Sequence, residues 1–298
     1  MKDIGASILA RLKNKSKELD IPYQQCLQLF VQEEFLRRLS KSKYADNLIL
    51  KGGYFIYTLS NFESRVTIDV DFLLKQVISS IEDVQKVIEH IVATPAGNDY
   101  IKMTAKKFEE ISAQRKYKGV SAQITAEIKR VKIPFNIDIG VGDVILPHVQ
   151  SNLVNTQLQD FEKPEIKTYS LESVIAEKFD AILQRFELTS RMKDFYDIYY
   201  ISQTFDFEGL VLQEAMYGTL LYRKTAYESG SFVRIMGLVN DEAIQMRWRQ
   251  FLKKMPGVYL EFSEVMTGIQ QFLEPVFNKI VREELFSLNW NATKSQWG

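Results

Sequence analysis

The stretch that decides the fold runs from Leu50 to Leu74 and reads LKGGYFIYTLSNFESRVTIDVDFLL. Its Gly-Gly pair, Gly52 and Gly53, follows the short apolar run NLIL, which predicts a strand that ends in a tight turn, and YFIYTLS predicts a brief helix after it. The segment RVTIDVDFLL then alternates, which predicts a strand. One face of that strand would carry Val66, Ile68, Val70, Phe72 and Leu74, and the other Thr67, Asp69 and Asp71.

A second alternating segment, KIPFNIDIGVGD, predicts another strand with an acid on its polar face. Asp138 and Asn136 fall on that face, opposite Ile133, Phe135, Ile137 and Ile139. Residues two apart in a strand point the same way with Cα atoms roughly 6.5–7 Å apart, so Asp69 and Asp71 share a face. If the two strands are neighbours, Asp69, Asp71 and Asp138 meet in one place.

Clustered carboxylates repel one another unless a cation or a proton lies between them. Mg²⁺ is the expected cation, with Mn²⁺ as a substitute, because it takes oxygen ligands and binds through few carboxylates together with substrate phosphates. Two such ions would clamp the attacking and leaving oxygens of a phosphoryl displacement. The other interpretation is that these acids only occupy the solvent face of a half-exposed sheet.

The Gly-Gly turn fits a phosphate-binding role. Glycine lets the backbone approach a phosphate closely, and a helix that begins there would point its amide N–H groups at the anion. A bare Gly-Gly pair is also an ordinary strand-to-helix turn, and the sequence contains neither GxGxxG nor GxxxxGK[ST].

A second group of charged residues follows in LESVIAEKFDAILQRFELTSRMKDFYDIYYI. Two helices are predicted, over 170–186 and about 190–204. Lys178 and Arg185, seven residues apart, lie on or beside the apolar stripe of the first helix, and Asp194 borders the apolar face of the second. Such cations reach out to water or meet an anion. That anion is either a triphosphate or an internal partner such as Asp194.

The whole chain predicts an α+β protein. Strands interleaved with helices precede a region that is helix-like from about residue 206 to the end, so we expect a catalytic domain over 1–205 and a helical domain over 206–298. Lys+Arg and Asp+Glu both number 38, so a nucleic-acid contact requires a local basic patch. RWRQFLKK, from Arg247 to Lys254, is either such a patch or the solvated side of a helix. A single cysteine, no signal-peptide core and no membrane-spanning run predict a cytoplasmic protein.

Four segments together resemble the AbiEii/AbiGii-type nucleotidyltransferase toxin family of the polymerase-β-like superfamily. They are LKGG…RVTIDVDF, IDIGVGD, LESVIAEKFDAILQR and SRMKDFYDIYYI, in that order between about Leu27 and Ile201. The resemblance implies a polymerase-β-like nucleotidyltransferase core, a mixed sheet with flanking helices. One position departs from the family pattern, since Tyr54 stands where a small or hydroxyl residue usually follows Gly-Gly.

The resemblance also implies roles for individual residues. Gly52 and Gly53 match the turn that cradles the nucleotide phosphates, and Arg65 a polar position that precedes the acid pair. Asp69 and Asp71 match the metal-binding pair, with Asp138 as the third acid. Lys178 matches the lysine that holds the triphosphate, with Arg185 beyond it on the same helix, and Asp194 matches the essential aspartate of the last motif.

By this resemblance the protein transfers a nucleoside monophosphate from an NTP to an acceptor hydroxyl, such as the 3′ end of a tRNA. It would act as the toxin of a toxin–antitoxin or phage-defence system, with an antitoxin protein as partner. Two alternatives stay open. One is another metal-dependent transferase, because D-x-D also serves glycosyltransferases; the other is a non-catalytic nucleotide-binding or interaction protein on the same fold.

Overall fold

The computed structural model describes residues 3–75, 80–111, 119–141, 145–186, 190–255 and 257–298. The chain divides into two compact units, which we describe separately. Unit 1 contains Met1–Asp143 and Gln150–Thr168, and unit 2 contains Val144–Val149 and Tyr169–Gly298. The helices predicted around Lys178 and Asp194 therefore pack within unit 2, whereas the sequence assigned them to a catalytic domain ending at residue 205. That functional division stays a prediction.

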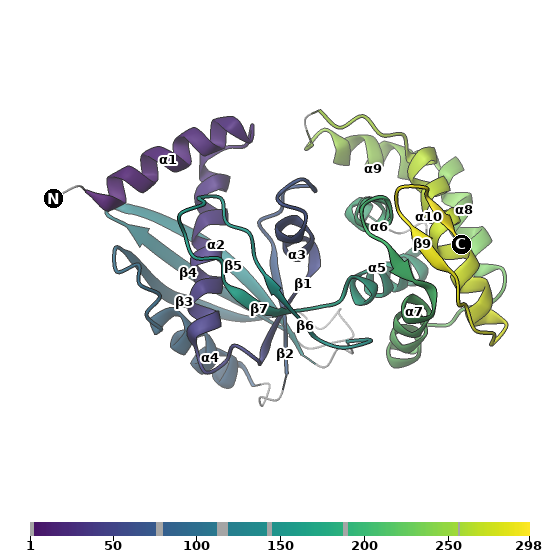
Figure 1. The fold of residues 1–298 in the computed structure, drawn as a ribbon, viewed down its shortest axis with the longest axis horizontal. Coiled ribbons are helices and arrows are strands. Elements are labelled where there is room, and N and C mark those ends of the chain that lie inside the picture. The colour runs from purple at the N-terminus through teal and green to yellow at the C-terminus, as the bar shows by residue number, and fades with distance from the viewer. Residues whose placement is uncertain (1–2, 76–79, 112–118, 142–144, 187–189, 256) are drawn as a thin grey trace. The chain divides into compact units, whose positions relative to one another are not determined.

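Unit 1 is a seven-stranded mixed sheet in the order β3-β4-β5-β2-β1-β7-β6 (Figure 1). Its helices are α1 (Ile4–Glu18), α2 (Tyr23–Lys41), α3 (Gly52–Leu59) and α4 (Ile81–Ala93). Its strands are β1 (Leu48–Lys51), β2 (Val70–Leu74), β3 (Ile101–Ile111), β4 (Gly119–Ile128), β5 (Val131–Val141), β6 (Gln150–Leu153) and β7 (Glu165–Thr168). The strand, turn and helix predicted around Gly52 are confirmed. No strand was predicted at β3, β6 or β7.

Helix α2 is the hub of unit 1. Figure 1 shows it lying across the sheet, and Phe35 contacts both Phe72 of β2 and Phe135 of β5, with ring centroids 5.9 and 6.3 Å apart. Unlike an ordinary surface helix, α2 is buried on all sides from Leu29 to Leu39. Helix α2 packs on the face of the sheet that carries Phe72 and Phe135. Side chains alternate between the two faces along a strand, so Asp71 of β2 and Asp138 of β5 belong to the opposite face.

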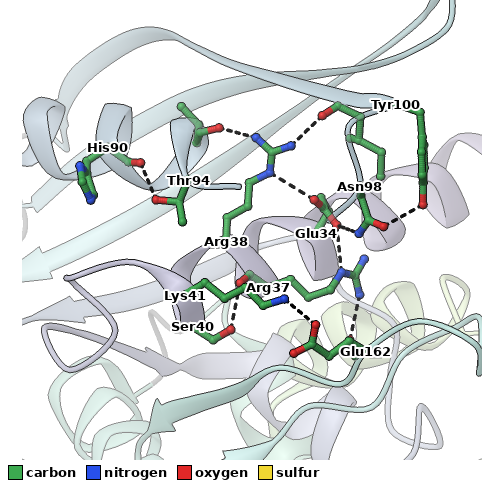
Figure 2. Close-up of polar contacts among 12 residues, drawn as sticks. Glu34, Arg37, Arg38, Ser40, Lys41, His90, Thr94, Asn98, Tyr100 and Glu162 are labelled. Carbon is green, nitrogen blue, oxygen red and sulfur yellow. Dashed lines mark hydrogen bonds and ion pairs between the residues drawn. The ribbon is translucent and has the colours of Figure 1, made fainter. Parts of the chain in front are cut away.

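Two buried arginines of α2 share one buried carboxylate of the same helix (Figure 2). Nε of Arg37 and Nε of Arg38 donate to the Glu34 carboxylate at 2.9 and 3.2 Å, and Nδ2 of Asn98 donates to it at 2.6 Å. Arg38 also donates to the backbone carbonyls of Val92 and Ile101. These bonds join α2 to α4 and β3, so this face of the sheet has a fixed support.

The predicted strand over RVTIDVDFLL is shorter than expected, because β2 begins only at Val70. In the residues before it the alternation is reversed, since Thr67 is buried and Ile68 is 41% exposed. The cause is the end of β1: Lys51 pairs with Asp71, and the chain then turns into α3. The backbone is held instead by side chains, with Nε2 of Gln32 donating to the Ile68 carbonyl at 2.8 Å and the Asp69 amide donating to Thr67 Oγ1 at 3.2 Å.

Unit 2 consists mainly of helices. They are α5 (Leu171–Arg185), α6 (Met192–Thr204), α7 (Gly209–Arg223), α8 (Ser231–Gly237), the 3-10 turn η2 (Leu238–Asn240), α9 (Glu242–Leu252) and α10 (Phe262–Val281). The two predicted helices correspond to α5 and α6. Helix α5 packs on α7, and α10 packs on α6. No helix in the described part of the chain is long and apolar enough to cross a membrane.

The expectation of helix to the end of the chain is wrong. A three-stranded sheet forms from β8 (Phe207–Glu208), β9 (Asn289–Asn291) and β10 (Gln296–Trp297). Two tryptophans hold it, because Nε1 of Trp290 donates to the Ser202 carbonyl at 2.7 Å and Nε1 of Trp297 donates to the Phe272 carbonyl at 3.0 Å. Aromatic side chains with a satisfied N–H favour short strands over continued helix here.

Candidate active site

The Gly-Gly turn joins β1 to α3 in a conformation that requires glycine. Gly52 has φ +74°, in the left-handed region, and a Cβ on it would lie 2.5 Å from Oδ2 of Asp71. The first glycine therefore gives room to a carboxylate as well as to the turn. Asp71 lies against the N-terminus of α3, where the helix dipole favours negative charge.

The second glycine lies in close contact with a neighbouring cation. A Cβ on Gly53 would lie 2.7 Å from Nη2 of Arg65 and 3.3 Å from Cγ2 of Thr67. The Arg65 guanidinium thus lies directly over the turn. The structure places the two predicted phosphate-binding glycines and the predicted arginine together.

The two predicted acid strands are neighbours, as the hypothesis required. Strands β2 and β5 pair in parallel with Asp71 opposite Asp138, so their side chains project from the same face. Asp69 lies just before β2 and is exposed, whereas Asp71 and Asp138 are half-buried. A pocket of about 330 Å³ lies at this end of the sheet, with Asp69, Asp138, Asn136 and Gln123 among its lining residues.

A divalent ion fits part of this acid set. Neighbouring strands lie about 4.8 Å apart, so Asp71 and Asp138 are close enough that both would hold one divalent ion. Mg²⁺ ordinarily uses only one or two carboxylates and completes its shell with water and phosphate oxygens. In the described part of the chain no three His, Cys, Asp or Glu residues are gathered closely enough to hold a metal by themselves. A magnesium site formed by Asp69, Asp71 and Asp138 together stays a prediction.

The second predicted group forms a closed ion cluster in unit 2. Nζ of Lys178 donates to Oδ1 of Asp194 at 3.0 Å and to Oδ2 of Asp197 at 2.6 Å, and Arg191 pairs with Asp194. The side chains of Lys178, Asp194 and Asp197 are 9%, 0% and 3% exposed. The internal ion pair between Lys178 and Asp194 that the sequence left open is therefore present. Triphosphate binding by Lys178 stays a prediction.

Charge decides the protonation of this cluster. Burial by itself would raise the pKa of Asp194, but the charges of Lys178 and Arg191 outweigh burial and hold that pKa below its ordinary value. Asp194 is therefore ionised at neutral pH. A carboxylate with a lowered pKa is a weak base, which favours a role in holding the two cations.

Two other predicted features are less central. Arg185 is exposed at the last turn of α5, so its guanidinium reaches water without an internal partner being required.

In the RWRQFLKK segment, Trp248 is 2% exposed and its Nε1 donates to the Leu260 carbonyl at 2.8 Å. The tryptophan is thus part of the core, while Arg249 of α9 and the two lysines after the helix, Lys253 and Lys254, are exposed to solvent.

Sequence reasoning missed one charged residue at the turn. Lys51 ends β1 and pairs with Asp71, which places a cation in the same row as the acids. The sequence shows that Lys51 directly precedes Gly52, but its alignment with Asp71 depends on how the two strands pair.

A larger hollow of about 720 Å³ on the C-terminal sheet, lined by Asp206, Asn289 and Lys294 among others, contains none of the predicted residues.

Comparison with known proteins agrees with the fold and the motifs. The family model "Nucleotidyl transferase AbiEii toxin, Type IV TA system" matches residues 34–274. MenT4, a nucleotidyltransferase toxin from Mycobacterium tuberculosis H37Rv, superposes with a TM-score of 0.51 at 15% identity, over 93% of this chain and 98% of that one. JHP933 from Helicobacter pylori superposes with a TM-score of 0.49 at 13% identity, over 85% of this chain and 93% of that one. No curated protein sequence matches significantly.

Proposed function

Because the chain belongs to the AbiEii family of nucleotidyltransferase toxins, we propose that it transfers a nucleoside monophosphate from an NTP to a 3′-terminal hydroxyl of RNA, with tRNA as the acceptor. The observation that carries this proposal is the parallel register of Asp71 and Asp138 beside the Gly52 turn. A phosphate-binding turn and a paired acid site on one sheet face are what nucleotidyl transfer needs.

In this proposal, different residues of unit 1 bind the nucleotide phosphates and the metal ion. The amides of the Gly52–Gly53 turn and the guanidinium of Arg65 bind the nucleotide phosphates. Asp71 and Asp138 would hold Mg²⁺, which would supply charge neutralisation to the reacting phosphate. The acceptor oxygen forms a bond to the α-phosphorus, and the bond from that phosphorus to pyrophosphate breaks.

The acceptor hydroxyl must lose its proton during this step. Asp71 and Asp138 form a row of acids across β2 and β5, which we call the acid row. Asp138 also lines the pocket, so we assign it the role of proton acceptor. In unit 2, Asp194 acts as a positioning residue that keeps Lys178 and Arg191 in place. The products are RNA extended by one nucleoside monophosphate, pyrophosphate, and the hydroxyl proton taken up by Asp138, so all atoms of the two substrates are accounted for.

Labelled transfer tests the proposal directly. The protein is incubated with Mg²⁺, total RNA and each labelled NTP in turn, and label in RNA, in protein and in small molecules is separated by electrophoresis and chromatography. We expect label in the tRNA band with Mg²⁺ or Mn²⁺ and none with EDTA. Label only in protein or in a glycan would assign another transferase class, and no label together with NTP binding would favour a non-catalytic protein.

The cellular setting follows from the family and the composition. As a toxin of a toxin–antitoxin system, the protein is paired with an antitoxin, and we place it in the cytoplasm, where NTP and tRNA are found. Expression from a tight promoter should arrest growth, and the Asp71→Ala variant should not. Equal growth of both strains at equal protein level would contradict a toxic transferase.

A further inference from the structure

Lys51 belongs to the same row of side chains as the acids. It pairs with Asp71 across β1 and β2, and Asp71 pairs with Asp138 across β2 and β5. Residues directly opposite one another in a sheet project from the same face. One cation and two carboxylates therefore form a continuous row across three strands, and the row ends at the Gly52 turn.

The ammonium of Lys51 extends along this face as far as β5. A Cβ on Gly140, two residues beyond Asp138 and on the same face, would lie 4.0 Å from Nζ of Lys51. Glycine at 140 leaves the surface of β5 open at that point. The lysine stem thus passes over β2, and its charge lies beside the acid row rather than out in solvent.

The backbone around Lys51 makes a cation there unfavourable by itself. Lys51 is the N-cap residue of α3, and its side chain makes no capping bond to that helix. The N-terminus of a helix carries partial positive charge, which repels an ammonium and attracts an anion. Together with Arg65 over Gly53, this end of α3 concentrates positive charge next to Asp71.

We propose that Lys51 is a phosphate-binding residue of the transfer site and contacts the leaving pyrophosphate of the NTP. This inference rests on the proposed function and adds a residue to it. Asp71 and Asp138 would hold the metal, Arg65 and the glycine amides bind phosphate on one side of the turn, and Lys51 binds it on the other. When the bond between the α-phosphorus and the bridging oxygen breaks, the electron pair remains on pyrophosphate, and the Lys51 charge stabilises it.

Three variants separate phosphate binding from a purely structural charge. Lys51→Met removes the charge, Lys51→Arg keeps it, and Lys132→Met is the control, because Lys132 is an exposed residue on the same face of β5, about 20 Å from Asp138. Calorimetry measures binding of Mg²⁺ alone, of Mg²⁺ with inorganic pyrophosphate, and of Mg²⁺ with each of the four NTPs.

We expect Lys51→Met to weaken both Mg²⁺–pyrophosphate and Mg²⁺–NTP binding ten- to a hundredfold, as for loss of one charged hydrogen bond. Lys51→Arg should bind within about fivefold of wild type, and Lys132→Met should be unchanged. If Lys51 only neutralises the acids, Lys51→Met will bind Mg²⁺ alone more tightly and bind NTP as well as wild type does. That pattern overturns the inference but leaves the proposed function intact, whereas a wild-type protein that binds no NTP overturns both.

A measurement on the wild-type protein avoids any folding defect of the variants. Lysines are acetylated briefly with acetic anhydride, with and without saturating Mg²⁺–NTP, and modification at Lys51 and Lys132 is quantified by mass spectrometry. We expect the nucleotide to slow acetylation of Lys51 at least fivefold and to leave Lys132 unaffected. Equal acetylation of Lys51 in both conditions overturns the inference.

Discussion

The acid row of unit 1 (Asp71 and Asp138) and the ion cluster of unit 2 (Lys178, Asp194 and Asp197) differ in how deeply their carboxylates are buried and in what lies beside them. In unit 2, Asp194 and Asp197 are almost fully buried, and the protein itself supplies their cation through Lys178. In unit 1, Asp71 and Asp138 are half-buried in a row that borders a pocket. The acids of the ion cluster are thus buried against a cation of the same unit, whereas the acid row borders a pocket and, under the proposed function, takes Mg²⁺ and phosphate. Mutation should therefore affect stability in unit 2 and activity in unit 1.

The largest effect should come from Asp71→Ala. Loss of a carboxylate that faces both the Gly52 turn and Asp138 should reduce label transfer at least a thousandfold, because under the proposed function it removes the charge that would hold Mg²⁺ against the phosphates. Its melting temperature should stay within a few degrees of wild type. The control is Asp99→Ala, an exposed acid of unit 1, which should transfer normally. Transfer near the wild-type level by Asp71→Ala would remove the distinction between the two regions.

Lys178→Met should have the next largest effect, and it should be on stability. It leaves Asp194 and Asp197 buried without their shared ammonium, which costs roughly 3–5 kcal/mol of unfolding free energy. The double variant Lys178→Met, Asp197→Leu should recover much of the loss. Urea unfolding without nucleotide measures all three proteins.

The matched control in unit 2 is Lys253→Met, at an exposed lysine, which should change the unfolding free energy by less than about 0.5 kcal/mol. A neutral Lys178→Met that nevertheless binds NTP weakly would place the Lys178 ammonium against a ligand instead.

Glu33 of unit 1 is a third kind of acid to compare with these two groups, because it is fully buried and only one of its carboxylate oxygens is hydrogen-bonded among the described residues. Its Oε1 accepts from the Gln157 amide at 3.0 Å, and its Oε2 has no hydrogen-bond partner among the described residues. Burial raises the pKa of Glu33 to about 7, although the Arg37 charge opposes the change. Between about pH 4.5 and pH 7 the folded protein keeps a proton that the unfolded chain releases, so stability falls as pH rises, by about 3 kcal/mol in total.

Glu33→Gln should lack this pH dependence. Urea unfolding at pH 5 and pH 8 should show the variant gaining stability relative to wild type at the higher pH, since the amide never becomes charged. The other titrating groups cancel in the difference between the two proteins. Parallel pH profiles for wild type and variant would show that the Glu33 carboxylate is ionised throughout.

The smallest effect tests how the turn holds the acid row. Gly52→Ala forces alanine to φ +74° and brings its Cβ to 2.5 Å from Oδ2 of Asp71, whereas Gly97→Ala imposes φ +79° with nothing within 4 Å. The shared backbone strain costs about 1–2 kcal/mol. Urea unfolding should show Gly52→Ala to be the less stable variant, and only Gly52→Ala should lose NTP binding in calorimetry. Equal losses in both would mean that the Asp71 contact adds nothing.

Periodicity and spacing predicted the parts of the fold that obey local rules. The strand before Gly52, the helix after it and the alternation around Asp138 are all encoded in adjacent residues. The conformation of residues 65–69 was not predictable locally, because β1 ends at Lys51 and Gln32 of a distant helix binds the Ile68 carbonyl. The place of Lys51 in the acid row was missed for the same reason, since it depends on strand register.

The second unit shows a different limit. The helices that carry Lys178 and Asp194 were predicted from their apolar stripes, and the salt bridge between them was one of two open interpretations. Asp197 as a second partner depends on side-chain geometry that spacing does not fix. The small sheet of β8, β9 and β10 was missed because strands of two or three residues carry almost no periodic signal.

The parallel pairing of β2 with β5 has a consequence for the time at which the protein becomes active. Strands β3 and β4 separate these partners along the chain, and closing a loop of roughly 70 residues costs about 4 kcal/mol before any contact repays it. A ribosome adds about 5–20 residues per second, so β2 leaves the ribosome several seconds before β5. During that interval Asp71 has no Asp138 beside it. A growing chain of this toxin therefore lacks the paired acids until β5 has emerged, which delays the onset of its activity during synthesis.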